Sequence, residues 1–262
     1  MHINSVIELY SNGQIQEALD SVETLTKDYP NEPLLYNISG VCYKAIGQLD
    51  AAVKSFEKAL AIKPDYTEVC FNLGVTYREL DQLDAAVKCY MKALTFKPDY
   101  TEAHYNLGNA FKSLGQLDAA VKSYKKTLTL KSDHENAHNN LGNVLSDLGQ
   151  LNAAVKCYKK ALAINPDSSE AHNNLGATLK DLDQLDDAIK CYEKAIAIKP
   201  DYVEAHSNLG NAFKELGQVD DAVKFYENVL TLSPDDPEAH SNLGNALQEL
   251  GQVDAAVKCY QK

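Results

Sequence analysis

Tryptophan is absent from the 262-residue sequence, methionine occurs only twice, and no apolar run approaches the length of a membrane span. A membrane-crossing helix needs about 20 consecutive apolar residues, so we predict that the chain contains none. The opening residues, MHINSVIELY, lack a basic segment followed by an apolar one and therefore indicate no secretion signal. We expect a cytoplasmic protein.

Basic residues are too few to balance the acidic ones. The chain has 25 Lys and Arg against 37 Asp and Glu, which gives a formal net charge of -12. Nucleic-acid binding depends on clustered Lys and Arg, so we predict no nucleic-acid partner. The sequence also lacks C-x-x-C pairs, glycine-rich phosphate loops and an evident Ser-His-Asp or paired-carboxylate site. We therefore predict no catalytic residues, no metal, no cofactor and no enzyme activity.

The chain does contain a repeat of 34 residues, most regular at 67–100, TEVCFNLGVTYRELDQLDAAVKCYMKALTFKPDY. A fixed period of this size is typical of a solenoid built from one supersecondary motif. We number the positions of each repeat from 1 to 34 and expect a single array over 1–262. The repeats are 1–32 (degenerate), 33–66, 67–100, 101–134, 135–168, 169–202, 203–236 and 237–262 (truncated).

Each repeat has the pattern of two helices. In 67–100, apolar or small residues at positions 4, 7, 8 and 11 share one face of a helix over Glu68–Leu80. A second apolar face, which includes Ala86 and Tyr90, lies on a helix over Asp84–Phe96. The fold class we predict is therefore all-α, with about eight helix pairs.

Residues at the ends of the expected helices repeat as regularly as the apolar ones. Gly at position 15, or Asp81 and Asp183 in its place, is expected to adopt a left-handed conformation. Asp at position 18 is expected to cap the second helix, and pairs such as Asp65 and Glu68 to form an acidic capping box on the first. Proline at position 32 ends the second helix, and because Ser132 replaces it once, we expect that join to be the least rigid.

The pattern N-L-G-x-x-Y followed by A, Y, A and P at these spacings resembles the tetratricopeptide repeat, and it extends over nearly the whole chain. Gly74, Ala86 and Ala93 would allow two helices to approach closely, with Tyr90 filling the remaining space. The first repeat departs, with Val6 in place of the glycine. The phrases KPDYxEAH and NLGN further resemble the repeats of O-linked N-acetylglucosamine transferases and related bacterial proteins.

The resemblance implies a right-handed superhelix whose first helices line a concave groove that binds proteins or extended peptides, without catalysis by the repeat itself. In the resembling transferase repeats, an asparagine ladder at position 6 grips the peptide backbone. This chain has the ladder, with a second asparagine at position 9 in several repeats, and a carboxamide both donates and accepts hydrogen bonds. The position-6 residues are Asn72, Asn106, Asn140, Asn174, Asn208 and Asn242, and the position-9 residues are Asn109, Asn143, Asn211 and Asn245. Asparagine as mere polar filler, copied by duplication, is the alternative.

Charged residues accompany the ladder in the same groove. The cations at position 12 that we include in the candidate site are Arg78, Lys112, Lys180 and Lys214. Acidic residues at position 13 lie beside them, so a solvated mixed-charge face is the simpler interpretation. Position 5 is never lysine, so the clamp by which related domains bind acidic chaperone tails is absent. Lysines at position 22 form a second, outer row that we interpret as solvated.

Histidines at position 4 and cysteines at position 23 also recur. Successive repeats place equivalent side chains about 10 Å apart, which is too far for one metal ion or a disulfide. We interpret both as packing residues, with reduced thiols.

We therefore predict a non-catalytic scaffold that binds protein or extended peptide in the concave groove. Two alternatives remain open. The chain could be the recognition arm of a larger enzyme such as a glycosyltransferase, or a structural module that associates end to end through the open last repeat.

Overall fold

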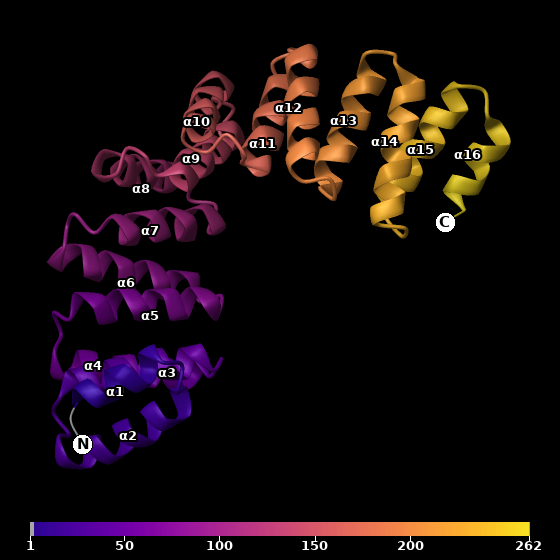
Figure 1. Cartoon of the computed structure of the whole chain (residues 1–262). Helices are drawn as coiled ribbons and strands as arrows, with labels where there is room; N and C mark the ends of the chain where they lie inside the picture. Colours follow the sequence, from indigo (N-terminus) through magenta and orange to yellow (C-terminus); the bar gives the residue numbers. More distant parts are fainter. Residues whose placement is uncertain (1–2, 262) are drawn as a thin grey trace. The chain divides into compact units, whose positions relative to one another are not determined.

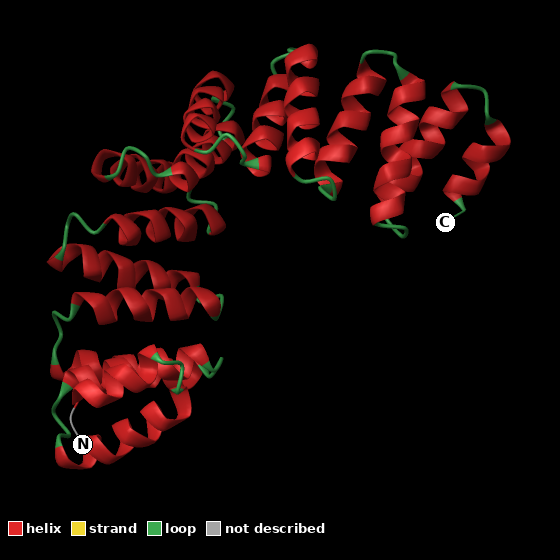
Figure 2. Cartoon of the chain, in the orientation of Figure 1, coloured by secondary structure: helices red, strands yellow, loops and turns green. Residues whose placement is uncertain are grey.

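The computed structural model describes residues 3–261, and over this range the chain consists of helices joined by short loops (Figures 1 and 2). Residues 1, 2 and 262, which belong to the repeats expected at 1–32 and 237–262, lie outside the described residues. The all-α fold class is confirmed. No helix within 3–261 combines the length and the apolar character that crossing a membrane requires.

The helices form two compact units that divide after Ser132. The N-terminal unit holds α1 (Ile3–Ser11), α2 (Ile15–Asp28), α3 (Pro33–Ala45), α4 (Leu49–Ile62), α5 (Thr67–Glu79), α6 (Leu83–Phe96), α7 (Thr101–Ser113) and α8 (Leu117–Leu130). The C-terminal unit holds α9 (Glu135–Asp147), α10 (Leu151–Ile164), α11 (Ser169–Lys180), α12 (Leu185–Ile198), α13 (Val203–Glu215), α14 (Val219–Leu232), α15 (Pro237–Glu249) and α16 (Val253–Tyr260).

Within each unit every helix packs on the next one along the chain, and several first helices of neighbouring repeats also touch. In the N-terminal unit α3 contacts α5 and α5 contacts α7, and in the C-terminal unit α9 contacts α11 and α11 contacts α13. The first helices therefore line one side of each unit, which brings their position-6 residues onto a common surface. The division between units coincides with the join at which Ser132 replaces proline, and its expected low rigidity stays a prediction.

A tyrosine ring packed on a glycine sets the distance between the two helices of a repeat. A Cβ atom added to Gly74 would lie 2.7 Å from the ring of Tyr90, closer than atoms of this kind can approach. Tyr90 is completely buried, and the same pair recurs in every later repeat. In the first repeat, Val6 replaces the glycine and Val22 replaces the tyrosine, and both valines are buried. The predicted close approach of the two helices is confirmed.

Asp at position 18 does not cap the second helix, so this prediction is wrong. The cap is the glutamine at position 16, such as Gln82, whose side chain makes no capping bond. The backbone N–H of Gln82 instead donates to the Tyr77 carbonyl at 2.8 Å. This tight turn starts α6 at Leu83, before Asp84. Asp84 lies in the first turn, where its charge favours the positive end of the helix dipole.

The acidic capping box is wrong as well. The first helix of the 67–100 repeat is capped by Tyr66, one residue after Asp65, and the Tyr66 side chain makes no capping bond. Side-chain caps do occur where the residue type allows, as Ser168 and Asp236 accept from the N–H groups of Ala171 and Ala239. The glutamate at position 2 is therefore available for other contacts.

The left-handed residues at position 15 are confirmed. The glycines there have φ between 70° and 78°, and Asp81 and Asp183, which replace glycine, have φ of 58° and 57°. A side chain in this region is strained because its Cβ approaches the following carbonyl oxygen.

Replacing Asp81 or Asp183 by glycine should therefore stabilise the fold by about 0.5–1 kcal/mol each, after allowing for the greater entropy of unfolded glycine. Urea unfolding followed by circular dichroism measures the change. The reverse substitution, Gly217→Asp, is the matched control and should destabilise by a similar amount. An Asp81→Gly protein with a lower urea midpoint would contradict this account.

Candidate functional site

The asparagines at position 6 are half-buried, and those with resolved side-chain contacts are held by a neighbouring repeat. In the C-terminal unit the amide of Asn174 donates to the Oδ1 of Asn139 at 3.2 Å, and that of Asn208 donates to Asn173 at 3.0 Å. In the N-terminal unit Asn72 approaches Asn37 at 3.5 Å in the same way. In each case the acceptor is the position-5 asparagine of the preceding repeat.

Two of the position-5 asparagines also form a hydrogen bond to a glutamate. Asn139 and Asn173 are buried, and their amides donate to Glu170 and Glu204 at 2.9 and 3.0 Å. A chain of Asn, Asn and Glu therefore bridges two consecutive repeats and satisfies polar groups that burial would otherwise leave unpaired. Sequence reasoning missed this bridge, although asparagine at position 5 followed by glutamate 31 residues later was a signal for it.

The bridge fixes the position-6 side chains without using all their hydrogen-bonding groups. Asn174 and Asn208 each commit one N–H, and no residue of the described chain donates to their Oδ1 atoms. Asn106 differs, because its Oδ1 accepts from the Arg78 guanidinium at 3.1 Å. Asn140 and Asn242 are half-buried at the same repeat position. A carboxamide locked in one orientation with an open oxygen can accept a hydrogen bond from a ligand at little entropic cost.

The asparagines at position 9 have a structural contact of their own. Each accepts a hydrogen bond from the hydroxyl of the tyrosine at position 24 in the same repeat. The oxygen–oxygen distances are 2.7 Å for Tyr124–Asn109 and 2.8 Å for Tyr158–Asn143, Tyr226–Asn211 and Tyr260–Asn245. One acceptor position of each carboxamide oxygen is therefore taken up by a tyrosine of the same repeat.

Two repeats have the tyrosine at position 24 but lack the asparagine at position 9, and their tyrosine hydroxyls lose the bond. Val75 and Ala177 stand at position 9, and the hydroxyls of Tyr90 and Tyr192 are buried without a hydrogen-bond partner. Burial raises the pKa of Tyr90 to about 12. The repeat at 33–66 avoids the problem, because its position-24 residue is Phe56, which has no hydroxyl.

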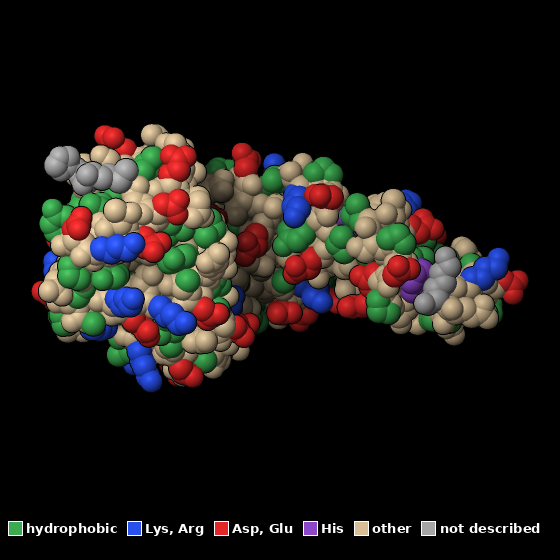
Figure 3. Space-filling model, turned by 90° about the horizontal axis from the view of Figure 1, so that it is seen from below, with side chains coloured by type: hydrophobic (Ala, Val, Ile, Leu, Met, Phe, Trp, Pro, Cys, Tyr) green, Lys and Arg blue, Asp and Glu red, His purple; other side chains and the backbone are tan. Residues whose placement is uncertain are grey.

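The charged residues near the row pair between repeats. Lys44 contacts Glu79 at 3.0 Å and Lys180 contacts Glu215 at 3.3 Å, in each case from position 12 to position 13 of the next repeat. In the view of Figure 3, basic and acidic side chains are interspersed over the surface that is shown. These contacts favour a mixed-charge surface over a site that binds charged ligands specifically.

The recurring histidines hold the joins between repeats. The Nε2 atoms of His104, His206 and His240 each donate to the carbonyl of the proline six residues earlier at 2.9 Å. Within residues 3–261 no three His, Cys, Asp or Glu side chains group closely enough to hold a metal ion. The cysteines, all in the described range, form no disulfide, and burial raises the pKa of the Cys89 and Cys191 thiols to about 11.

An apolar hollow of about 380 Å³ lies on the first-helix side of the N-terminal unit. Ile38 stands there at position 6 in place of asparagine. The lining residues are Ile7, Tyr10, Leu34, Asn37, Ile38, Val41, Glu68 and Asn72. The hollow therefore adjoins the first member of the asparagine row.

Comparison with known proteins gives one family. The sequence profile described as TPR repeat matches residues 40–81, 76–115, 108–149, 142–183, 179–217 and 210–251. The crystal structure of MamA is 29% identical, with a TM-score of 0.59 over 62% of this chain and 95% of MamA. No curated protein sequence matches the chain.

Two more distant structures share the fold. Cut9, from the APC/C hetero-tetramer Cut9–Hcn1, has a TM-score of 0.68 at 18% identity, over 92% of this chain and 48% of Cut9. YrrB, described as a TPR protein with an unusual peptide-binding site, has a TM-score of 0.60 at 22% identity, over 71% of this chain and 96% of YrrB.

The unpaired tyrosine hydroxyls lead to a stability prediction. Ala177→Asn should give the Tyr192 hydroxyl the partner that its counterparts have, and stabilise the fold by about 1 kcal/mol. Thermal and urea unfolding measure the change. In a Tyr192→Phe background no hydroxyl remains to be satisfied, so the gain should vanish. An equal gain in both backgrounds would show that helix propensity or surface effects, not the hydroxyl, were responsible.

Proposed function

Because the chain belongs to the tetratricopeptide repeat family, we propose that it is a non-catalytic scaffold that binds an extended segment of a partner protein along its first helices. The observation that carries the proposal is the set of locked position-6 carboxamides, whose oxygens in Asn174 and Asn208 have no partner in the described chain. A recognition arm of a larger enzyme would use the same surface, so the experiments below apply to that alternative too.

The spacing of the row suits an extended peptide. Packed helices lie about 10 Å apart, and an extended chain advances about 3.3 Å per residue. Successive asparagines would therefore contact residues of the partner that are about three positions apart. A hydrogen bond between carboxamide and peptide backbone contributes about 1 kcal/mol net, so affinity grows with the number of repeats engaged and depends weakly on partner side chains.

The remaining candidate residues have smaller roles in this proposal. Asn109, Asn143, Asn211 and Asn245 would contribute less than the position-6 asparagines, because each already accepts a hydrogen bond from a tyrosine hydroxyl of its own repeat. Arg78, Lys112, Lys180 and Lys214 would contribute little specificity, since those with resolved contacts already pair with a neighbouring repeat.

The apolar hollow beside Asn72 adds one element of sequence preference. It offers apolar surface from α1 and α3 next to the Glu68 carboxylate. We infer that segments bound by the N-terminal unit carry one large apolar side chain, followed by a basic residue.

The triple variant Asn140→Ala, Asn174→Ala and Asn208→Ala should weaken partner binding tenfold or more, which corresponds to about 1.4 kcal/mol. Because two of these side chains also bridge repeats, we expect some loss of stability, roughly 1 kcal/mol per bridge, without unfolding. Calorimetric titration with a partner captured by the wild-type chain gives the affinity, and circular dichroism gives the fold.

The matched control changes one lysine in each of the same three repeats, Lys156→Ala, Lys190→Ala and Lys224→Ala. These side chains are exposed on the second helices, and their loss should leave the affinity unchanged. Full affinity in the folded asparagine variant, with loss in the lysine variant, would move the contact to the outer row and refute the proposed groove.

Self-association is a second candidate function, favoured by the exposed apolar surface of the last repeat. Val253 is 59% exposed and Tyr260 48%, whereas the equivalent Val219 and Tyr226 one repeat earlier are 7% and 1% exposed. An added repeat, such as the first repeat of a second copy, would cover this surface.

Light scattering over a wide concentration range should then show a mass that rises with concentration, and Val253→Lys with Val257→Lys should abolish the rise. Met91→Lys, which removes an exposed apolar residue of α6, is the control and should have no effect. A wild-type chain that stays monomeric at the highest concentration would rule out this second function.

A further inference from the structure

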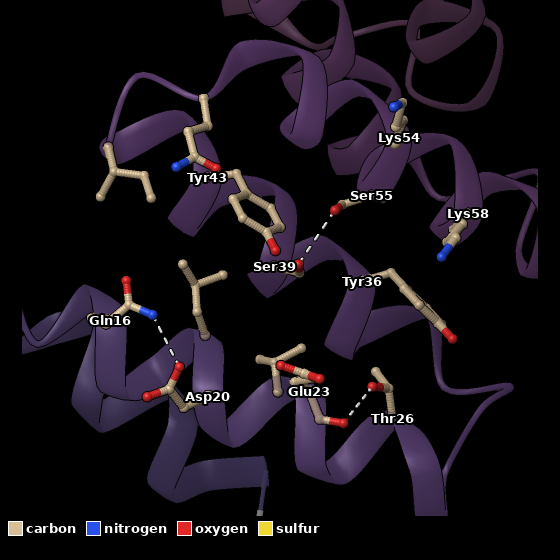
Figure 4. Close-up of a pocket in the computed structure, with 14 residues that line it drawn as sticks. Gln16, Asp20, Glu23, Thr26, Tyr36, Ser39, Tyr43, Lys54, Ser55 and Lys58 are labelled. Atoms are coloured by element: carbon tan, nitrogen blue, oxygen red, sulfur yellow. Dashed lines mark hydrogen bonds between the residues drawn. The ribbon is translucent and has the colours of Figure 1, made fainter.

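A second hollow, of about 400 Å³, lies in the N-terminal unit on the side of α2 and α4, away from the asparagine row (Figure 4). Helix α2 contributes Asp20 and Glu23 to one wall, and α4 contributes Lys54 and Lys58 to the opposite wall. Between them α3 presents aromatic rings, including that of Tyr43. The size is within the range typical of small-molecule sites.

Two buried residues that line the hollow are smaller than their counterparts in most later repeats. Position 7 is leucine in every later repeat, for example the buried Leu73, but is Ser39 in this one. Position 23 is Ser55, where four later repeats have cysteine. Ser39 and Ser55 are both 8% exposed, and their hydroxyls lie 3.3 Å apart at the floor of the hollow. Two polar groups thus stand where most later repeats have leucine and cysteine.

The two charged walls do not neutralise each other. Within the described chain no ion pair joins Asp20 or Glu23 to Lys54 or Lys58, and the partners they do have lie on their own walls or at the floor. Asp20 accepts from Gln16 of the same helix, and the Lys58 ammonium lies 5.8 Å from the ring centre of Tyr36. The hollow therefore separates an acidic wall from a basic one, with aromatic surface between them.

We propose that this hollow binds a zwitterionic small molecule of about the size of a dipeptide. Its cationic group faces Asp20 and Glu23, its anionic group faces Lys54 and Lys58, and its apolar middle packs on Tyr43. The serine hydroxyls at the floor supply short polar contacts. The site is independent of the proposed peptide groove, because second helices and the outer side of α3 form it.

The test uses the full chain labelled with ¹⁵N and the dipeptide glycyl-L-phenylalanine as the probe. Saturable shifts of the Ser39, Tyr43 and Ser55 amide resonances are expected at millimolar probe. N-acetylation of the probe removes its cation and C-terminal amidation removes its anion, and each should weaken binding about fivefold or more. Equal binding of all three compounds would overturn the charge assignment, and no saturable shift would overturn the site.

Protein variants test the same site with the same dipeptide. Ser39→Leu restores the residue of the later repeats, so it should keep or raise the melting temperature while weakening binding at least tenfold. Lys54→Glu with Lys58→Glu changes only exposed side chains and should weaken binding fivefold or more even if the leucine variant folds poorly. Asn72→Ala, in the asparagine row, should leave dipeptide binding unchanged. Wild-type affinity in a folded Ser39→Leu protein, or in the double lysine variant, would refute the proposal.

Discussion

The packing of a tyrosine ring on a glycine at position 8 is the constraint on which the rest of each repeat depends. The ring brings the two helices together at a distance that no larger residue than glycine permits, and it fills the interface completely, as Gly142 and Tyr158 illustrate. The same ring places a hydroxyl at the end of the interface, where it must find a partner. The asparagine one residue after the glycine meets that demand. One close contact thus determines three positions of the repeat.

A second set of contacts decides how one repeat follows another. The buried amides of Asn139 and Asn173 each accept from the next repeat and donate to it, and the histidine–proline bonds tie the same joins from the other side. These contacts give the position-6 row a role in the fold as well as in the proposed function. The sequence suggested that these asparagines either bind a peptide or are polar filler. Neither interpretation included an asparagine whose N–H group stabilises the array while its oxygen stays open.

The sequence predicted what depends on periodicity and steric size, and it failed where local hydrogen bonds compete. The left-handed residues and the glycine–tyrosine pairs could be predicted because each follows from residue type at one position. The Asp84 cap could not, because a backbone bond from Gln82 to Tyr77 starts the helix at Leu83, two residues earlier than a cap by Asp84 would. The period places Asn174 on the correct face, but it does not reveal that Asn139 lies within hydrogen-bonding distance of it.

The two kinds of asparagine contact differ in what they imply for the rearrangement of such genes. The tyrosine–asparagine bond lies inside one repeat, so a repeat that is duplicated, deleted or moved takes both partners with it. The Asn–Asn–Glu bridge crosses a join, so it survives only where a repeat with asparagine at position 5 precedes one with asparagine at 6 and glutamate at 2. Any repeat can therefore be copied without losing the hydrogen bond in its interior. The bonds between repeats, in contrast, depend on the order in which the copies follow one another.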